Sequence, residues 1–356
     1  MSMEERYQRH FQLKEVGKKG QQKLSKAKVL VVGAGGLGCP ALQYLAAAGI
    51  GTLGIMDPDV VSLSNLQRQI LYNEKDLGKN KAKCAEKYLK ALNNEIHFQG
   101  FPFALTHENA LNYLSQFDII VDGTDNFYSR YLISDACLLL QKVMVYGAVF
   151  KYEGQVSVFH YQNGPSYRCL FPSPPELGEI PSCSEIGVLG IVPGIIGMYQ
   201  ALEVLKIVLE LGEVFNGKLY CINLLNHQTR ILDFKKNKEE IAKIKKQDRV
   251  FPIVNKDCSL DFEVSLAQLS SEEKIIWIDV REEGEMPRLS HLKPLTSALA
   301  LDSIKDSEEK VIAFCQTGQR SKAFIQKLKK EGIKNCFSLK EGAEQLQIWE
   351  KKQSSK

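Results

Sequence analysis

The sequence lacks the long apolar segments of membrane and exported proteins. A bilayer-spanning helix needs about 20 mostly apolar residues, and the longest apolar helical pattern, residues 194–211, is interrupted by Glu203, Lys206 and Glu210. The first ten residues contain no apolar core of the kind found in signal peptides. These absences predict a cytoplasmic protein that has no membrane partner.

Cysteine pairs and an excess of one charge are also missing. The nine cysteines are an odd number and none form a Cys-x-x-Cys pair, which argues against a disulfide framework and a four-cysteine zinc site. The 46 basic and 42 acidic residues give a net charge of +4, too balanced to indicate a nucleic-acid partner. With 44% hydrophobic and 25% charged residues, the composition is that of an ordinary globular protein.

The length of 356 residues predicts about two domains. A Lys-rich stretch with few apolar residues begins at Phe234. No aromatic residues are interleaved with its lysines, which favours a solvated linker or a short surface helix over a nucleic-acid patch. We therefore divide the chain into a first domain, residues 1–233, a charged linker, residues 234–258, and a second domain, residues 259–356.

Short apolar strands alternate with helical patterns through the first domain. Strands are expected at residues 28–32, 51–56, 117–121 and 143–150, and helices at 40–48, 79–92 and 127–140. This alternation predicts an α/β fold with a Rossmann-like, mainly parallel sheet and helices on both faces. Residues 155–159 and 218–225 could add edge strands to that sheet.

A glycine-rich loop follows the first strand and opens a helix. Its glycines are Gly33, Gly35, Gly36 and Gly38, and Asp57 ends the second strand. Glycines let the backbone approach a phosphate, a helix N-terminus favours anionic charge, and an acid after the second strand can hold a ribose hydroxyl. The pattern predicts a bound nucleotide, and taken alone it fits NAD as well as ATP.

The residues downstream favour a triphosphate. Arg68 and Lys81 follow the ribose acid, and Asp125 lies at the exit of a later strand. A dinucleotide has only a pyrophosphate to neutralise, whereas ATP carries more charge and usually Mg²⁺, which a carboxylate such as Asp125 can hold. Taken singly, each of these residues could equally be a solvated surface charge.

Together these motifs resemble the MoeB/ThiF/HesA family, the bacterial relatives of ubiquitin-activating enzymes. The later stretches 181–190 and 200–206 most closely resemble its molybdopterin-synthase adenylyltransferase branch. The resemblance covers residues 1–233 and includes the opening segment around Arg9. It implies that ATP is held by the loop glycines and Asp57 together with Ser64, Asn65, Arg68, Gln69, Lys81, Asp125 and Asn126, with Mg²⁺ on Asp125. It also implies a homodimer in which Arg9 crosses to the partner's ATP.

The resemblance further implies a reaction. The C-terminal glycine carboxylate of a small ubiquitin-like sulfur-carrier protein ending in Gly-Gly, of the molybdopterin-synthase small-subunit type, attacks the α-phosphate of ATP. Pyrophosphate leaves and an acyl adenylate remains, while the enzyme positions the reactants and stabilises charge. Arg68, Lys81 and the partner's Arg9 would neutralise the phosphates.

Two cysteines of the first domain stand out against the family pattern. Relatives often carry a structural zinc on two Cys-x-x-Cys pairs, but Ser166 stands where the first cysteine would precede Cys169, and no second pair follows Leu232. One thiolate cannot supply four ligands, so we expect no structural zinc. Cys183 lies in a Pro/Ser/Gly-rich loop, where the family implies a nucleophile for acyl or persulfide transfer and the alternative is a buried small residue.

A cysteine-containing loop marks the second domain. Cys315 follows an expected strand at 310–314, Arg320 lies five residues further on, and a helix is expected at 322–330. The helix N-terminus and Arg320 should favour the thiolate, so we expect Cys315 to be alkylated fastest of the nine cysteines.

This loop and the segment Asp279-Val-Arg281 resemble a rhodanese domain. The resemblance implies a small α/β fold, a persulfide donor and a persulfide on Cys315 that converts the acyl adenylate to a thiocarboxylate. The stretch between Arg281 and Val311 is short, so a structural remnant without sulfurtransferase activity remains the alternative.

Other functions stay open at this point. The sulfur carrier could belong to the thiamine pathway instead. An NAD-dependent oxidoreductase would explain the glycine-rich loop and Asp57 but not Arg68, Lys81 and Asp125 together. A non-catalytic scaffold that binds the carrier would have no need of groups suited to Mg²⁺ and a triphosphate.

Overall fold

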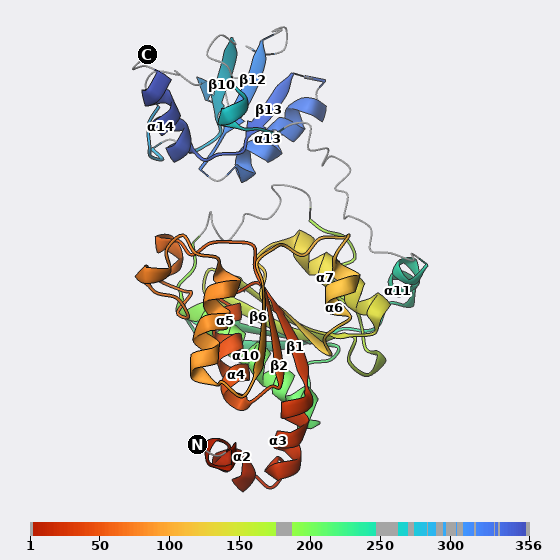
Figure 1. Ribbon diagram of the computed structural model, residues 1–356. Helices are drawn as coiled ribbons and strands as arrows, with labels where there is room; N and C mark the ends of the chain where they lie inside the picture. Colours follow the sequence, from red (N-terminus) through yellow and green to blue (C-terminus); the bar gives the residue numbers. More distant parts are fainter. Residues whose placement is uncertain are drawn as a thin grey trace. The chain divides into compact units, whose positions relative to one another are not determined.

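The structure, a computed structural model, describes residues 3–175, 187–246 and most of 263–353 (Figure 1). Within the last range the residues that are not described are 270–273, 283, 290–294, 297–303, 305–308, 317, 331 and 334. The chain divides into two compact units. The first comprises residues 1–174 and 182–253, and the second consists mainly of residues 254–356.

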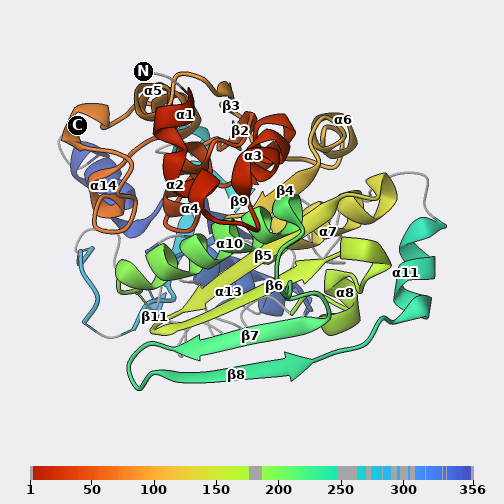
Figure 2. The same ribbon diagram turned by 90° about the horizontal axis from the view of Figure 1, so that it is seen from below.

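An eight-stranded sheet forms the centre of the first unit (Figure 2). In spatial order its strands are β3 (His97–Phe101), β2 (Thr52–Met56), β1 (Lys28–Val32), β4 (Ile119–Asp122), β5 (Val143–Phe150), β6 (Glu153–Phe159), β7 (Lys218–Asn223) and β8 (Gln228–Asp233). β3 to β5 pair in parallel, and β6 to β8 extend the sheet by antiparallel pairs. The strand order reverses at β1, so the connections after β1 and β4 diverge at one edge, where such sheets bind nucleotides.

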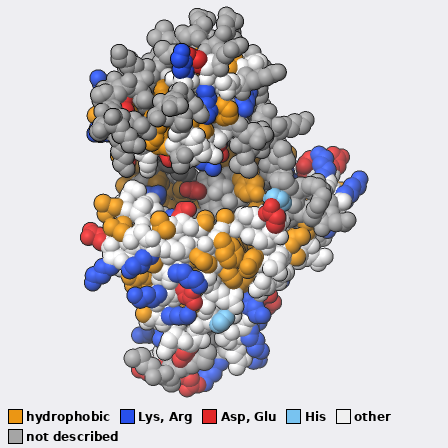
Figure 3. Space-filling view, turned by 45° about the horizontal axis from the view of Figure 1, so that its top comes forward, with side chains coloured by type: hydrophobic (Ala, Val, Ile, Leu, Met, Phe, Trp, Pro, Cys, Tyr) orange, Lys and Arg blue, Asp and Glu red, His pale blue; other side chains and the backbone are white. Residues whose placement is uncertain are grey.

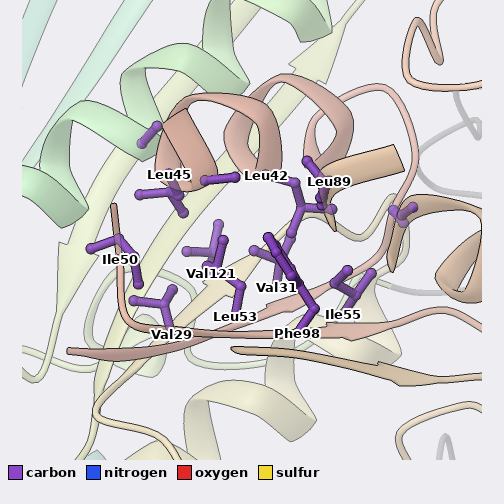
Figure 4. Packing of buried hydrophobic residues seen from close by; sticks show 14 of the residues in the cluster. Val29, Val31, Leu42, Leu45, Ile50, Leu53, Ile55, Leu89, Phe98 and Val121 are labelled. Atoms are coloured by element: carbon purple, nitrogen blue, oxygen red, sulfur yellow. The ribbon is translucent and has the colours of Figure 1, made fainter. Parts of the chain in front are cut away.

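Helices cover both faces of this sheet. α4 (Gly38–Ala48), α5 (Lys81–Leu92) and α10 (Ile191–Leu209) pack on one face, and α6 (Ala110–Leu114) and α7 (Phe127–Leu140) pack on the other. Alternate residues of β1 enter the two cores, as in any strand buried on both sides. Figure 4 shows the first core, in which Val29 and Val31 of β1 face Leu42 and Leu45 of α4.

Shorter helices surround this core. α1 (Met3–Arg6), α2 (Gln8–Gln12) and α3 (Gly17–Lys26) precede β1, α8 (Tyr167–Leu170) follows β6, and α11 (Lys238–Lys245) follows β8. α11 lies in the segment expected to be a linker or a surface helix, and its Ile241 and Ile244 are buried against Leu138 of α7. The first unit therefore continues past residue 233.

Among the described residues, α10 is the helix that is long and apolar enough to cross a membrane. It packs instead against α4, β5 and β6, and it buries Val192, Ile196 and Val204 completely. This is the packing of a core helix.

Charges of both signs are mixed on the surface of the first unit. Exposed ion pairs join Lys18 to Glu4 and Lys90 to Glu86. On the face that Figure 3 shows, basic side chains (blue) are interspersed with acidic ones (red) and uncharged surface. This distribution matches the balanced composition of the sequence.

The second unit is a smaller α/β fold. Its five parallel strands have the spatial order β11 (Leu295–Thr296), β10 (Ile275–Asp279), β12 (Lys310–Phe314), β13 (Cys336–Leu339) and β9 (Glu263–Val264). α13 (Gln319–Lys330) contributes Ile325 and Leu328 to one core, and α14 (Ala343–Gln353) contributes Leu346 to the other. The two helices therefore lie on opposite faces of the sheet.

The fold class predicted from the sequence is confirmed. The expected helix at 127–140 and strand at 143–150 coincide with α7 and β5, and the suggested edge strands appear as β6 and β7. β3 was not expected. Only Phe98 in that strand is buried, so the apolar alternation that would mark it in the sequence is weak.

Candidate functional site

The loop between β1 and α4 needs its glycines for different reasons. Gly33 has a φ of +91°, and a Cβ there would lie 2.6 Å from the carbonyl oxygen of Gly123. A Cβ on Gly38 would lie 1.9 Å from the carbonyl oxygen of Gly33. At Gly35 the nearest atom would be Nε2 of Gln69, at 3.6 Å. Packing thus requires Gly33 and Gly38, whereas Gly35 borders space that a ligand can use.

The loop presents backbone donors. Within the described residues, the N–H groups of Gly35, Gly36 and Leu37 donate to no protein acceptor. Among the neighbouring residues, Gly33 donates to the Met56 carbonyl and Cys39 donates to the Gly35 carbonyl. The three donors lie at the N-terminus of α4, where the helix dipole adds positive potential. This arrangement is suited to a phosphate group.

Asp57, at the end of β2, is bound to this loop. Its Oδ2 accepts the N–H of Ala34 at 2.8 Å, and its Oδ1 accepts the N–H of Asp59 at 2.8 Å. The side chain is buried, and burial raises the pKa of its carboxyl. Asp57 therefore holds the loop through the backbone N–H of Ala34. Each of its carboxylate oxygens keeps a lone pair that can accept a further donor such as a ribose hydroxyl.

Lys81 lies beside Asp57 and has an acidic partner that sequence reasoning missed. It is the first residue of α5, where Asn80 caps the helix. Its Nζ lies 3.0 Å from Oδ2 of Asp59, and its side chain is 6% exposed whereas that of Asp59 is 66% exposed. The sequence offered one signal for this contact, since Asp59 lies two residues after Asp57 in the same turn.

The segment between these acids and Lys81 brings Arg68 and Gln69 to the loop. A short 3₁₀ helix (Leu63–Asn65) turns the chain, the Asn65 carbonyl accepts the N–H groups of both residues, and Nη1 of Arg68 donates to the Ser64 carbonyl at 3.0 Å. The Arg68 stem passes over Gly36, with Cγ 3.6 Å from where a Cβ would stand. Gln69 is buried, and its Oε1 has no hydrogen-bond partner among the described residues.

Two aspartates at the end of β4 differ in burial and in hydrogen bonding. Asp122 is fully buried and accepts hydrogen bonds from the N–H and the hydroxyl of Thr124, at 3.0 and 2.6 Å. Asp125 is exposed, and among the described residues it has no hydrogen-bond or ion-pair partner. Asn126 instead uses Oδ1 to cap α7 through the N–H of Ser129, at 2.9 Å. Asp125 is thus the carboxylate available for a cation.

Arg9 is not brought to the loop of its own chain. It lies on α2, where its Nη1 donates to Gln12 at 3.2 Å. The neighbouring Tyr7 accepts a hydrogen bond from Asn93, which follows the last residue of α5. α5 begins near the loop and ends near Tyr7, so Arg9 lies at the opposite end of the sheet (Figure 1).

In the second unit, Cys315 directly follows β12 and is completely buried. The hydroxyl of Ser321 lies 3.7 Å from its Sγ. Arg320 binds Glu285 with both terminal nitrogens, at 2.6 and 2.7 Å, and this pairing lowers the pKa of Glu285 to about 2.

These contacts argue against two expectations about the second unit, which stay predictions. Arg320 makes a bidentate ion pair with Glu285, 35 residues earlier, so its charge is already matched by a carboxylate. Burial also argues against Cys315 being alkylated fastest, because the half-exposed thiols among the described residues are those of Cys169 and Cys221. No local sequence pattern indicated that Glu285 would pair with Arg320.

The remaining expectations about cysteines concern the thiol of Cys169, a structural zinc site and Cys183. The sulfur of Cys169 accepts the N–H groups of Ser166 and Asn237, at 3.3 and 3.2 Å. Within the described ranges, no group of three His, Cys, Asp or Glu side chains could hold a metal. Cys183 lies outside the described residues.

Comparison with protein families gives two matches. Residues 7–243 match the ThiF family, and residues 264–348 match the rhodanese-like domain. Sulfur carrier protein adenylyltransferase of Thermus thermophilus is 47% identical over 238 residues, which are 65% of this chain and 88% of that protein. Adenylyltransferase and sulfurtransferase MOCS3 of Xenopus laevis is 39% identical over 334 residues, 88% of this chain and 73% of that one.

A further relative and a solved structure agree with these matches. Probable molybdopterin-synthase adenylyltransferase of Porphyra purpurea is 42% identical over 299 residues, covering 82% of this chain and 78% of that protein. The crystal structure of E. coli MccB with ATP is similar with a TM-score of 0.58 at 22% identity, and the match covers 65% of this chain and 72% of that one. At that identity the structural match concerns the fold alone.

Proposed function

The chain belongs to the ThiF family and carries a rhodanese-like domain, and we propose that it adenylates a sulfur-carrier protein and then converts the adenylate to a thiocarboxylate. The carrier is a small ubiquitin-like protein of the molybdopterin-synthase type, as the names of the relatives suggest. The observation that carries the first step is the ring of groups around the loop after β1. Within the part of the chain that the structure describes, this ring contains three N–H donors without a protein acceptor, Arg68, Lys81 and the carboxylate of Asp125, which has no protein partner.

The first step follows from these charges. An oxygen of the carrier's C-terminal carboxylate forms a bond to the α-phosphorus of ATP, and pyrophosphate leaves with the electron pair of the broken P–O bond. Lys81 and Arg68 neutralise phosphate oxygens, and the N–H groups of Gly35 and Gly36 hold the same charge without having to reorganise. Asp125 would hold Mg²⁺, which supplies further neutralisation of the leaving group.

The second step belongs to Cys315. The terminal sulfur of a Cys315 persulfide, formed by transfer from a persulfide donor, attacks the adenylate carbonyl and displaces AMP. This leaves an acyl disulfide between the carrier and Cys315. A second thiol must then attack the Cys315 sulfur, which releases the thiocarboxylate and leaves a disulfide. Cys183 is our candidate for that thiol.

We further propose a homodimer with shared ATP sites. Arg9 is exposed and lies far from the loop of its own chain, so it can serve a site only in a partner. α10 supplies a face for that partner, since Ile191 and Leu202 are 59% and 48% exposed. They belong to an outward stripe with spacings of four, three and four residues, as in helices that pair: Ile191, Ile195, Met198 and Leu202.

One experiment tests the adenylation. The full chain is mixed with ATP, Mg²⁺ and a purified carrier of the molybdopterin-synthase or thiamine type, and intact mass is recorded with labelled pyrophosphate exchange. We expect the carrier to gain the mass of AMP and the exchange to require the carrier's terminal glycine. Tight binding of NAD with no exchange for either carrier would refute the proposal.

A further inference from the structure

Ala34, the second residue of the glycine-rich loop, is fixed on both sides of its backbone. Its N–H donates to Asp57, and its carbonyl oxygen accepts the hydroxyl of Tyr72 at 2.8 Å. The thiol of Cys39 donates to the same oxygen at 3.4 Å. Tyr72 comes from the segment after Gln69, and it lies 38 residues from Ala34 in the sequence.

The two donors fill the acceptor capacity of this carbonyl. A carbonyl oxygen has two lone pairs, and Tyr72 and Cys39 direct one proton to each. In a helix that started one turn earlier, the same oxygen would accept the N–H of Gly38. Because the oxygen is occupied, the N–H of Gly38 also has no protein acceptor within the described residues. It therefore adds to the N–H groups of Gly35, Gly36 and Leu37, which lack an intrahelical acceptor at the start of any helix, as donors that a ligand can use.

The residues that make these contacts are buried, and burial keeps the two donors protonated. Ala34 and Cys39 are completely buried and Tyr72 is 6% exposed. Burial raises the pKa of Cys39 to about 12 and raises that of Tyr72 as well. Both side chains therefore keep their protons, and remain donors, over the pH range in which proteins are usually folded.

We propose that Tyr72, assisted by Cys39, is a positioning residue for ATP, because it holds the Ala34 carbonyl and so keeps the loop N–H groups directed at the phosphates. This inference rests on the proposed function, since it concerns the same nucleotide site. Tyr72 contacts the loop from the buried core and acts only through it.

The test removes one hydroxyl and compares it with a matched hydroxyl elsewhere. Tyr72→Phe deletes the bond to Ala34. Tyr131→Phe deletes the hydroxyl of another buried tyrosine, which donates to the Phe171 carbonyl at 3.0 Å on the opposite face of the sheet. For the full chain, ATP dissociation constants, the KM for ATP and kcat in pyrophosphate exchange, and melting temperatures are measured for both variants.

We expect Tyr72→Phe to raise the dissociation constant and KM for ATP about five- to tenfold, the worth of one hydrogen bond, with little change in kcat at saturating ATP. Tyr131→Phe should lower the melting temperature to a similar extent and leave KM unchanged. Cys39→Ala, which removes the weaker donor, should shift KM in the same direction by a smaller factor.

The outcomes separate the inference from the proposed function. If wild-type protein binds ATP and Tyr72→Phe binds it equally well, Tyr72 has only a structural role and the inference is wrong. If Tyr72→Phe does not fold, Cys39→Ala decides, and an unchanged KM in that variant overturns the inference. A wild-type protein that neither binds nor exchanges ATP would instead overturn the proposed function.

Discussion

The carboxylates of the first unit differ in how their oxygens are used. Asp57 and Asp122 are buried and accept hydrogen bonds from nearby backbone N–H groups, so they shape the turns after β2 and β4. Asp125 is exposed and has no protein partner within the described chain. The sequence alone could not separate these roles, because all three are aspartates at or just after strand ends.

At the residue scale, Asp125→Asn should abolish most of the adenylation. Removal of this charge should lower pyrophosphate exchange by about a hundredfold or more, as for other groups that stabilise charge in the transition state. The matched control is Asp118→Asn, at the opposite end of β4, where the side chain caps the N–H of Lys28. Exchange at the wild-type rate in Asp125→Asn would remove this residue from the site.

The pair of Glu285 and Arg320 predicts a pH-dependent stability of the second unit. The pKa of Glu285 is lowered from 4.5 to about 2, so the pair stabilises the folded state fully above pH 4.5 and loses its effect as the pH falls towards 2. Glu285→Gln should therefore be less stable than wild type at pH 7, and the difference should shrink between pH 4.5 and 2.

Fluorescence can follow this effect selectively, because both tryptophans of the sequence, Trp277 and Trp349, lie in the second unit. Urea unfolding is recorded at several pH values for wild type, Glu285→Gln and the control Glu282→Gln, an exposed neighbour. A stability difference that does not change with pH would contradict the assignment of the pair.

At the scale of elements, the sequence predicts structure that depends on local residue patterns. It does not predict contacts between residues that are distant in the chain. The strand, glycine loop and helix around Gly33 could be predicted because their spacing is local and their chemistry is specific. β3 could not, because it is an edge strand with one buried residue. The bonds of Tyr72 to Ala34 and of Arg320 to Glu285 join residues 38 and 35 positions apart, and no single-sequence period encodes such pairs.

The position of α2 makes the shared site testable. Arg9→Ala and Lys81→Ala should each be inactive as homodimers. If Arg9 acts on the partner's ATP, a mixed dimer contains one intact site, so an equimolar mixture that exchanges subunits should recover up to about a quarter of wild-type exchange. An active monomer in light scattering, or no recovery after confirmed subunit exchange, would contradict this arrangement.

At the scale of the whole molecule, the two units divide the chemistry. Adenylation uses charges of the first unit and needs no thiol, so Cys315→Ala should leave pyrophosphate exchange unchanged. Thiocarboxylate formation from a persulfide donor, measured by the mass of the carrier, should stop. Cys336→Ala is the control, since it removes another buried thiol of the same unit. Normal thiocarboxylate yield without Cys315 would make the second unit a structural remnant.

The separation of the two sheets along the chain has a consequence for biosynthesis. Every strand of the eight-stranded sheet lies between Lys28 and Asp233, and every strand of the smaller sheet lies between Glu263 and Leu339. No residue synthesised after Asp233 contributes a strand to the eight-stranded sheet. A ribosome adds about 5–20 residues per second, so the larger unit has several seconds to fold before the last strand of the smaller one has been synthesised.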